Sequence, residues 1–316
     1  MSTDWAKIIL DSDTSETAWA DIFTSLLTMA KEISSPVALH DATVVPDRLL
    51  TEAAWELWES YPEYAVKTSS MLKEWTNNGS GKAVLILDAL SLREMSIILN
   101  AASDRGIIPV QVNVAGSECP STTDHFAKAI GLPSRSSLAN DTKPGTFLLF
   151  GGKCYTDVIS IPFEDCTVPP SANIVIWHSW LDDLIHLQKL PDQIASLASK
   201  TLQGDGFWTF INKLRQGRSL VITSDHGYAV SKRFSSEVED SEAVKILRET
   251  FGASRNKAFV DPWQTRFMPP IVMTHNKQNI VMGQRKWKVQ SGFPDVCHGG
   301  MSLLEVAVPY MEFPAL

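Results

Sequence analysis

The sequence predicts an α/β protein whose mostly parallel central sheet is covered by helices on both faces. Three observations support this fold class. Beyond residue 81, short apolar runs rich in β-branched residues alternate with helical patterns, as in strands joined by crossover helices. The apolar runs are continuous, which is typical of strands buried on both faces. The chain has 316 residues, of which 44% are hydrophobic, so it can build a sizeable core.

The first part of the chain carries a helical pattern. Ala18, Ile22 and Leu26 recur at helical spacing, and Pro46 opens a second helical run. The segment 77–81 is rich in Asn and Gly and is the clearest linker. We therefore expect an N-terminal helical extension over residues 1–80 and an α/β domain over residues 81–316.

The elements of the α/β domain are expected in the following order. Strands are expected over residues 83–88, 107–114, 146–150, 173–177, 219–223, 270–274 and 305–308, and helices over residues 91–102 and 121–130. Residues 276–289, which contain Gly283, are expected to form a hairpin appended to the sheet.

Charge and composition exclude several classes of protein. The net charge of -8 argues against strong non-specific binding of nucleic acid by the whole surface. The four cysteines show no Cys-x-x-Cys pairing, so neither a zinc ribbon nor a disulfide framework is expected. There is no leader-like N-terminus and no apolar run long enough to cross a bilayer, so we expect a cytoplasmic protein without membrane contact.

Acidic residues and histidines follow several of the expected strands. Because open α/β sheets place their sites at the carboxyl ends of the strands, these side chains are candidates for one metal site. Asp182 and His186 lie four residues apart, so one face of a helix would present both. The candidate ligands are Asp88, Asp182, His186, Asp225, His226 and His298.

The sequence Pro-Ser-Thr-Thr-Asp at residues 120–124 precedes an expected helix. A Ser or Thr at this place is commonly an N-cap. A hydroxyl that touches a divalent ion can instead become an activated nucleophile. Thr122 and Thr123 both stay open as that hydroxyl at this point, and Asp182 and Asp183 are adjacent candidates on the later helix.

Together these motifs resemble the PglZ domain of the alkaline phosphatase superfamily over about residues 82–313. The resemblance rests on Asp88, Pro-Ser-x-Thr at 120–123, Asp-x-x-x-His at 182–186, Ser-Asp-His-Gly at 224–227 and His-Gly-Gly-x-Ser-x-x-Glu at 298–305. It implies an alkaline-phosphatase-like catalytic domain with two divalent ions, zinc first and manganese or magnesium as alternatives. It implies one ion on Asp88, Thr123, Asp225 and His226, and the other on Asp182, His186 and His298. Many PglZ domains carry an arginine soon after the first aspartate, where this chain has Ser91 and reaches Arg93 two positions later.

The resemblance also implies a function. With Thr123 as a metal-activated nucleophile, the chain would be a phosphodiesterase or nuclease that acts on nucleotides or nucleic acid, in a bacterial phage-defence setting. Two alternatives stay open. One is a phosphomonoesterase or phosphomutase of the same superfamily. The other is a non-catalytic interaction module of a defence complex, in which the aromatic-rich N-terminal helices bind a protein partner.

Overall fold

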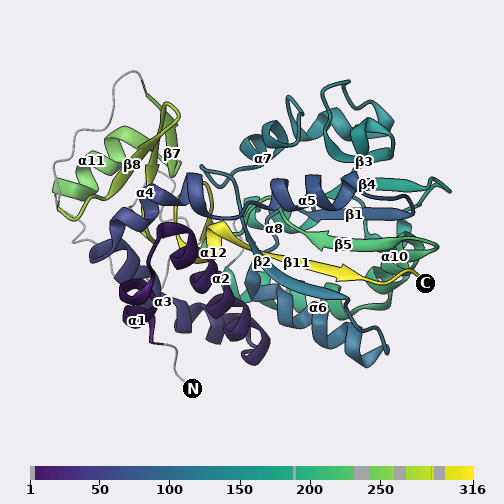
Figure 1. Cartoon of the computed structure of the whole chain (residues 1–316), viewed down its shortest axis with the longest axis horizontal. Coiled ribbons are helices and arrows are strands. Elements are labelled where there is room, and N and C mark those ends of the chain that lie inside the picture. The colour runs from purple at the N-terminus through teal and green to yellow at the C-terminus, as the bar shows by residue number, and fades with distance from the viewer. Residues whose placement is uncertain (1–3, 188–189, 231–241, 260–267, 286, 288–295) are drawn as a thin grey trace.

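A central sheet organises the part of the chain described by the computed structural model, which comprises residues 4–187, 190–230, 242–259, 268–285, 287 and 296–316. Within these residues, six strands form the sheet in the order β2-β11-β5-β1-β4-β3 (Figure 1). Strands β5, β1, β4 and β3 are parallel, and β11 is antiparallel to β2 and β5. The predicted mostly parallel α/β fold is therefore confirmed. The strands are β1 (Lys82–Leu87), β2 (Gln111–Gly116), β3 (Tyr155–Ile159), β4 (Asn173–His178), β5 (Ser219–Thr223) and β11 (Ala307–Phe313).

Strand β1 is buried on both faces of the sheet, which explains why its sequence is apolar throughout. Ala83, Leu85 and Leu87 belong to the hydrophobic cluster on one face of the sheet, whereas Val84 and Ile86 belong to the cluster on the other. Successive side chains of a strand point to opposite faces, so two buried faces require an uninterrupted apolar run.

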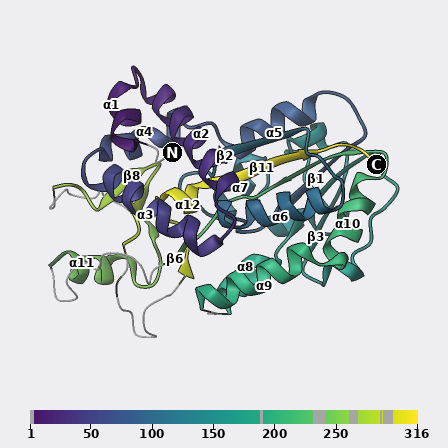
Figure 2. The same ribbon diagram turned by 90° about the horizontal axis from the view of Figure 1, so that it is seen from below.

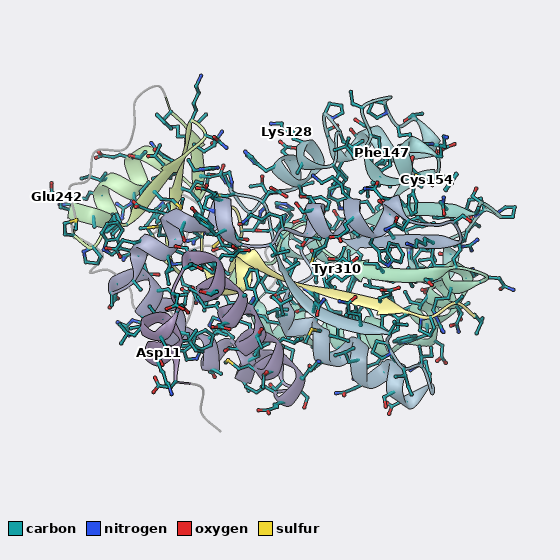
Figure 3. All side chains as sticks on the ribbon, in the orientation of Figure 1. Asp11, Lys128, Phe147, Cys154, Glu242 and Tyr310 are labelled. Carbon is teal, nitrogen blue, oxygen red and sulfur yellow. The ribbon has the colours of Figure 1, made fainter. Side chains whose placement is uncertain are left out.

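Helices cover both faces of the sheet. The face contacted by Leu85 is packed by α6, α9 and α10 (Figure 2). The opposite face is packed by α5, α7 and the 3-10 segment η2, and there the core includes Phe147 and Tyr310 (Figure 3). The elements are α5 (Thr68–Asn77), α6 (Leu92–Asp104), α7 (Thr123–Ala129), η2 (Leu149–Gly152), α9 (Pro191–Gln203) and α10 (Asp205–Arg215).

The N-terminal helices pack onto the sheet domain. Trp19 lies 5.2 Å from Trp58 and 4.9 Å from Tyr61 between ring centroids, and all three side chains are buried in the same hydrophobic cluster as Leu85. The hydroxyl of Tyr61 donates to the carbonyl of Ser117, 2.8 Å away. These aromatic residues therefore contribute to the core, while the domain boundary at residue 80 stays a prediction. The helices are α1 (Trp5–Asp11), α2 (Ser15–Glu32), α3 (Pro36–Glu52) and α4 (Trp55–Tyr64).

A small α/β unit lies at one end of the molecule, on the side where Glu242 is labelled in Figure 3. Its three described strands are antiparallel, in the order β7-β9-β8, and α11 packs on them. The run at 270–274 therefore belongs to this sheet as β8 and not to the central one, and it forms the hairpin with β9. Of the expected hairpin 276–289, residues 286 and 288–289 lie outside the described residues. The elements are α11 (Glu242–Phe251), β7 (Asn256–Ala258), β8 (Val272–His275) and β9 (Gln278–Val281).

Other expectations also need correction. No strand forms at 146–150, because the chain there turns into η2 with Phe150 at a φ of +55°. The edge strand is instead β3, in which polar and apolar side chains are mixed and which was not among the expected strands. Strand β2 begins at Gln111 rather than at residue 107, and a short helix α12 (Leu303–Val306) precedes β11.

Among the described helices, none combines the length and the apolar composition needed to cross a membrane.

Candidate metal centre

Three neighbouring strands deliver the candidate ligands to one edge of the sheet. Asp88 directly follows β1, and Asp225 and His226 lie just beyond β5. Helix α8 (Trp180–His186) follows β4 and carries Asp182 and His186. Because β5, β1 and β4 are adjacent and parallel, their carboxyl ends meet.

Three donor atoms converge around the hydroxyl of Thr123. Its Oγ1 lies 2.9 Å from Oδ2 of Asp225, 3.2 Å from Nε2 of His226 and 3.4 Å from Oδ1 of Asp88. Nε2 of His226 lies 3.4 Å from Oδ2 of Asp225 and 3.7 Å from Oδ1 of Asp88. We call Asp88, Thr123, Asp225 and His226 the first donor group.

The spacing within the first donor group matches the needs of a metal ion. Ligands that bind Zn²⁺ tetrahedrally at about 2.0 Å stand about 3.3 Å from one another. The five separations, from 2.9 to 3.7 Å, fall around this value. The residues present therefore fit a divalent ion without rearrangement of the backbone.

Asp182 is the centre of a second set, which we call the second donor group with His186 and His298. Nε2 of His298 lies 3.7 Å from Oδ1 of Asp182, and Nε2 of His186 lies 3.3 Å from Oδ2 of the same residue. Donor atoms of Asp182, His226 and His298 lie within 4.8 Å of one another. The His226 and His298 rings stack at 4.3 Å, so His226 lies between the two groups. The side chain of His186 is 65% exposed and lies at the rim.

The structure distinguishes the members of both adjacent doublets. Thr122 is the N-cap of α7, and its Oγ1 lies 2.7 Å from Nδ1 of His125. Oδ2 of Asp183 accepts a 2.7 Å hydrogen bond from the hydroxyl of Ser179. Thr122 and Asp183 are thus used in local contacts, whereas Thr123 and Asp182 face the donor groups.

Burial and mutual repulsion raise the pKa values of two carboxylates in the site, Asp225 and Asp182. Burial raises the pKa of Asp225 to about 7, and the neighbouring Asp88 adds to this effect. Burial likewise raises the pKa of Asp182, again with a contribution from Asp88. Charged carboxylates that are buried together are costly unless cations neutralise them. The site therefore favours the binding of positive charge.

The pKa values of His226 and His298 shift in opposite directions. Burial alone would lower the pKa of His226, but the carboxylates of Asp225 and Asp88 outweigh it and raise that pKa. Burial holds the pKa of His298 well below its usual value, and the charge of His226 lowers it further. A neutral imidazole is the form that binds a metal ion, so His298 is already suited to this role.

The turn after β1 ties two of the strand ends together. Ala89 has a φ of +64°, a left-handed conformation that costs a non-glycine residue roughly 1–2 kcal/mol. In this conformation its N–H donates to Oδ1 of Asp225 over 3.2 Å. The hydroxyl of Ser224 donates to the carbonyl of Leu87 over 2.8 Å. These contacts fix Asp88 relative to Asp225.

Two contacts of Asp88 were not predicted from the sequence. Nε1 of Trp177 donates to Oδ2 of Asp88 over 3.0 Å. Nη1 of Arg135 makes an ion pair with the same oxygen and lies 3.9 Å from Oδ2 of Asp182. Trp177 belongs to an apolar strand and Arg135 to the segment η1 (Arg135–Asp141), so neither lies in a recognisable motif.

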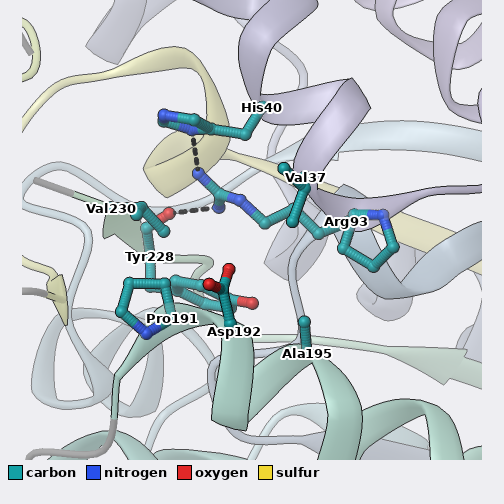
Figure 4. A pocket seen from close by; sticks show the side chains of 9 residues that line it. Val37, His40, Arg93, Pro191, Asp192, Ala195, Tyr228 and Val230 are labelled. Carbon is teal, nitrogen blue, oxygen red and sulfur yellow. Dashed lines mark hydrogen bonds between the residues drawn. The ribbon is translucent and has the colours of Figure 1, made fainter. Parts of the chain in front are cut away.

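Arg93 is the arginine nearest to Asp88 in the sequence, yet it points elsewhere. Its Nη1 donates to the carbonyl of Tyr228 over 2.5 Å, and its Nη2 lies 3.0 Å from Nδ1 of His40. The side chain lines a small pocket with Pro191 and Asp192 (Figure 4). It is 3% exposed and makes none of the contacts of the donor groups. A substrate-contacting role for Arg93 therefore has no support in the geometry.

A buried ion pair holds the loop that carries His298. The carboxylate of Glu305 accepts from Nε and Nη2 of Arg255, both at 2.9 Å, and from the N–H of Gly300 at 3.0 Å. From α3, Oδ1 of Asp47 accepts the N–H of Leu303 at 2.7 Å. Side chains from the small α/β unit and from the N-terminal helices therefore both position this loop.

His178 also has a structural role. Its Nδ1 accepts from the N–H of Trp180 over 3.2 Å, and its Nε2 lies 3.0 Å from the carbonyl of Ile161. Burial lowers the pKa of His178 to about 4. The ring stacks on Phe163, so it is a neutral core residue.

No family model and no curated protein matches this chain. Among solved structures, phosphonoacetate hydrolase from Sinorhizobium meliloti 1021, in complex with phosphonoformate, has a TM-score of 0.39 and 13% identity, covering 74% of this chain and 90% of that chain. Murine ectonucleotide pyrophosphatase/phosphodiesterase 5 has a TM-score of 0.44 and 12% identity, covering 75% and 88%. At this level of similarity, the chemistry of the site rests on the residues of this chain.

Proposed function

We propose that this chain is a metal-dependent phosphoesterase that hydrolyses phosphodiesters, with Thr123 as its nucleophile. The observation that supports this most directly is the position of Oγ1 of Thr123, which lies within 3.4 Å of donor atoms of Asp88, Asp225 and His226. A hydroxyl that only caps a helix needs no such surroundings, and Thr122 already serves as the cap of α7.

The residues suggest how the reaction would run. Divalent ions would supply Lewis-acid stabilisation of the phosphoryl group and acidify the hydroxyl. Oγ1 of Thr123 donates to Oδ2 of Asp225, which would itself help to hold the ion. The proton of the hydroxyl would therefore pass to water as Oγ1 attacks phosphorus. The bond from phosphorus to the leaving oxygen breaks as the bond to Oγ1 forms, and that oxygen takes up a proton from water to leave as the alcohol. Water then attacks the phosphothreonine and releases the phosphate product with Thr123 restored.

Charge favours a diester over a monoester. Arg135 adds a cation to this site, but its charge is already paired with Asp88. A diester brings one negative charge at its phosphorus, whereas a monoester brings up to two and would need further neutralisation. Phosphomonoester hydrolysis therefore ranks second.

The finer parts of the proposal rest on the resemblance to PglZ domains. That resemblance suggests a nucleotide or nucleic acid as the diester, a phage-defence setting, and a protein partner at the N-terminal helices. The imidazole and carboxylate donors at tetrahedral spacing favour zinc over manganese or magnesium. One ion would lie in the first donor group and the other in the second.

Hydrolysis of two chromogenic esters tests this function. Full-length protein would be treated with a chelator, reloaded with Zn²⁺ or Mn²⁺, and assayed with bis(4-nitrophenyl) phosphate and 4-nitrophenyl phosphate. We expect metal-dependent turnover of the diester, and a fall of about 10³-fold or more in Thr123→Ala. Thr122→Ala is the matched control, which should lose about 1 kcal/mol of stability and retain turnover.

Each result has a definite meaning. Full turnover in Thr123→Ala would exclude this residue as the nucleophile. Faster hydrolysis of the monoester would favour the phosphomonoesterase. If metal-replete protein hydrolysed neither ester, the interaction module would be the better hypothesis.

A further inference from the structure

Arg135 stands between carboxylates of the two donor groups. Its Nη1 contacts Oδ2 of Asp88, which belongs to the first group, and lies 3.9 Å from Oδ2 of Asp182, which belongs to the second. The side chain is 29% exposed. A single guanidinium nitrogen therefore faces both groups.

The position of Arg135 is fixed by the edge of the sheet. In η1, the backbone N–H of Asn140 donates to Oδ1 of Asp157 in β3 over 2.9 Å. From β3, the N–H of Thr156 donates to Oδ1 of Asp141 over 3.1 Å, and its hydroxyl donates to the carbonyl of Leu138 over 2.9 Å. The segment that carries Arg135 is thus anchored at several points to a strand of the central sheet.

The two oxygens of Asp88 have separate partners. Oδ1 faces Thr123 and His226, at 3.4 and 3.7 Å, whereas Oδ2 accepts from Trp177 and pairs with Arg135. A carboxylate oxygen has two lone pairs, so Trp177 and Arg135 together satisfy Oδ2. An ion bound through Oδ1 in the first donor group can therefore coexist with Arg135.

In the second donor group, Arg135 and a ligand face the same carboxylate oxygen. Oδ1 of Asp182 faces His298 at 3.7 Å, but Oδ2 lies 3.3 Å from Nε2 of His186 and 3.9 Å from Nη1 of Arg135. A divalent ion held by Asp182 would stand close to the guanidinium, and two positive charges in a largely buried site repel each other strongly. The arginine would also compete with that ion for the charge of Asp182.

We propose that Arg135 is a built-in cation of the metal centre, which makes the second donor group bind its divalent ion much more weakly than the first. The inference rests on the metal centre of the proposed function. It depends neither on the nucleophile nor on the substrate. Occupancy of the second group would then follow the available metal concentration, while the first group stays loaded.

Calorimetric titration of the chelator-treated full-length protein with Zn²⁺ tests this proposal. We expect one tight and one weak step for the wild type. In Arg135→Gln the second step should tighten by about tenfold or more, equivalent to about 1.4 kcal/mol. Arg135→Lys keeps the positive charge and should retain the weak second step.

Arg105→Gln is the matched control. Arg105 is 28% exposed and pairs with Asp205 at 2.9 Å, far from the donor groups in the fold. Its titration should equal that of the wild type. If Arg135→Gln does not fold, Arg135→Met provides a second neutral variant whose aliphatic stem can still pack.

A second step in Arg135→Gln or Arg135→Met that is no tighter than in the wild type would overturn the proposal. So would two equally tight steps in the wild type, or a tightened second step in Arg135→Lys. The ester assay is independent of these titrations. A protein that shows the predicted metal affinities but hydrolyses no ester would refute the proposed function alone.

Discussion

Nε1 of Trp177 donates a hydrogen bond to Oδ2 of Asp88 over 3.0 Å, from strand β4 to the end of β1. Trp177 is fully buried, and its ring meets Phe126 of α7 edge to face at a centroid distance of 5.3 Å. One aromatic side chain thus connects the Asp88 carboxylate of the first donor group with the helix that begins at Thr123.

Replacing Trp177 by Phe should weaken metal binding. The change removes one donor from a buried carboxylate, and groups that support metal ligands typically contribute 10- to 100-fold in affinity. We expect a loss of about tenfold in Zn²⁺ affinity by competition with a chromogenic chelator. Trp208→Phe is the control, because its Nε1 donates to the carbonyl of Leu202 at 2.8 Å and touches no ligand. Equal affinity in both variants would contradict a positioning role for Trp177.

Asp182→Asn and Asp183→Asn should behave differently although the residues are adjacent. Asp182 faces His186 and His298, so its loss should remove one equivalent of bound metal. Asp183 only accepts from Ser179 near the start of α8, so its variant should bind metal like the wild type. Calorimetric titration with Zn²⁺ distinguishes them, because the weak second step should be absent in Asp182→Asn and present in Asp183→Asn. A loss of metal confined to Asp183→Asn would reverse the assignment.

The stability of the protein should fall as the pH rises from about 4 to 7, partly because of Asp47. Burial raises the pKa of this carboxyl from 3.8 to about 7. Between these values the folded state holds a proton that the unfolded state has lost, so the contribution is complete below pH 3.8 and vanishes above 7. At about 1.4 kcal/mol per unit, the loss is on the order of 4 kcal/mol.

Asp47→Asn should reduce this pH dependence because Asn does not titrate. Its amide oxygen can still accept the N–H of Leu303, so the contact with the loop is kept. Urea unfolding of the metal-free protein at pH 5 and pH 8 is the measurement. Burial also raises the pKa of Glu94 to about 7, so a residual slope of the same sign should remain. An unchanged pH dependence in Asp47→Asn would show that Asp47 is not responsible.

Glu305→Gln should destabilise the protein and disturb the loop that carries His298. The change leaves the guanidinium of Arg255, which is 3% exposed, without its carboxylate. Breaking a buried pair from one side typically costs about 3–5 kcal/mol. The double variant Arg255→Gln, Glu305→Gln removes both charges and should recover part of this loss in urea unfolding. A double variant whose loss equals the sum of the two single losses would indicate no coupling.

The central sheet could be predicted because its inner strands are continuous apolar runs. Strands β1, β4 and β5 are buried on both faces, and their uninterrupted apolar residues predict this burial. The edge was harder to predict. Strand β3 contains Thr156 and Asp157 and is only partly buried, whereas the more apolar run at 146–150 folds into η2 around Phe150. Burial depends on neighbours that local sequence does not reveal.

The candidate metal ligands Asp88, Asp225 and His226 could be predicted because they follow these apolar strands. Polar residues that end buried strands need a partner at the edge of the sheet, and the structure brings Asp88, Asp225 and His226 together there. Arg135 and Trp177 could not be found in this way. Their contacts with Asp88 span 47 and 89 positions of the chain and depend on the path of η1 and the facing of β4.

The position of β11 affects how this protein can be made. Although it is the last of the sheet strands along the chain, β11 lies inside the sheet between β5 and β2. A ribosome must therefore release residues 307–313 before β5 and β2 acquire their shared neighbour. During synthesis the segment after β5, with Asp225 and His226, lacks this support. We expect nascent chains that stop before residue 307 to bind zinc poorly and to depend on chaperones.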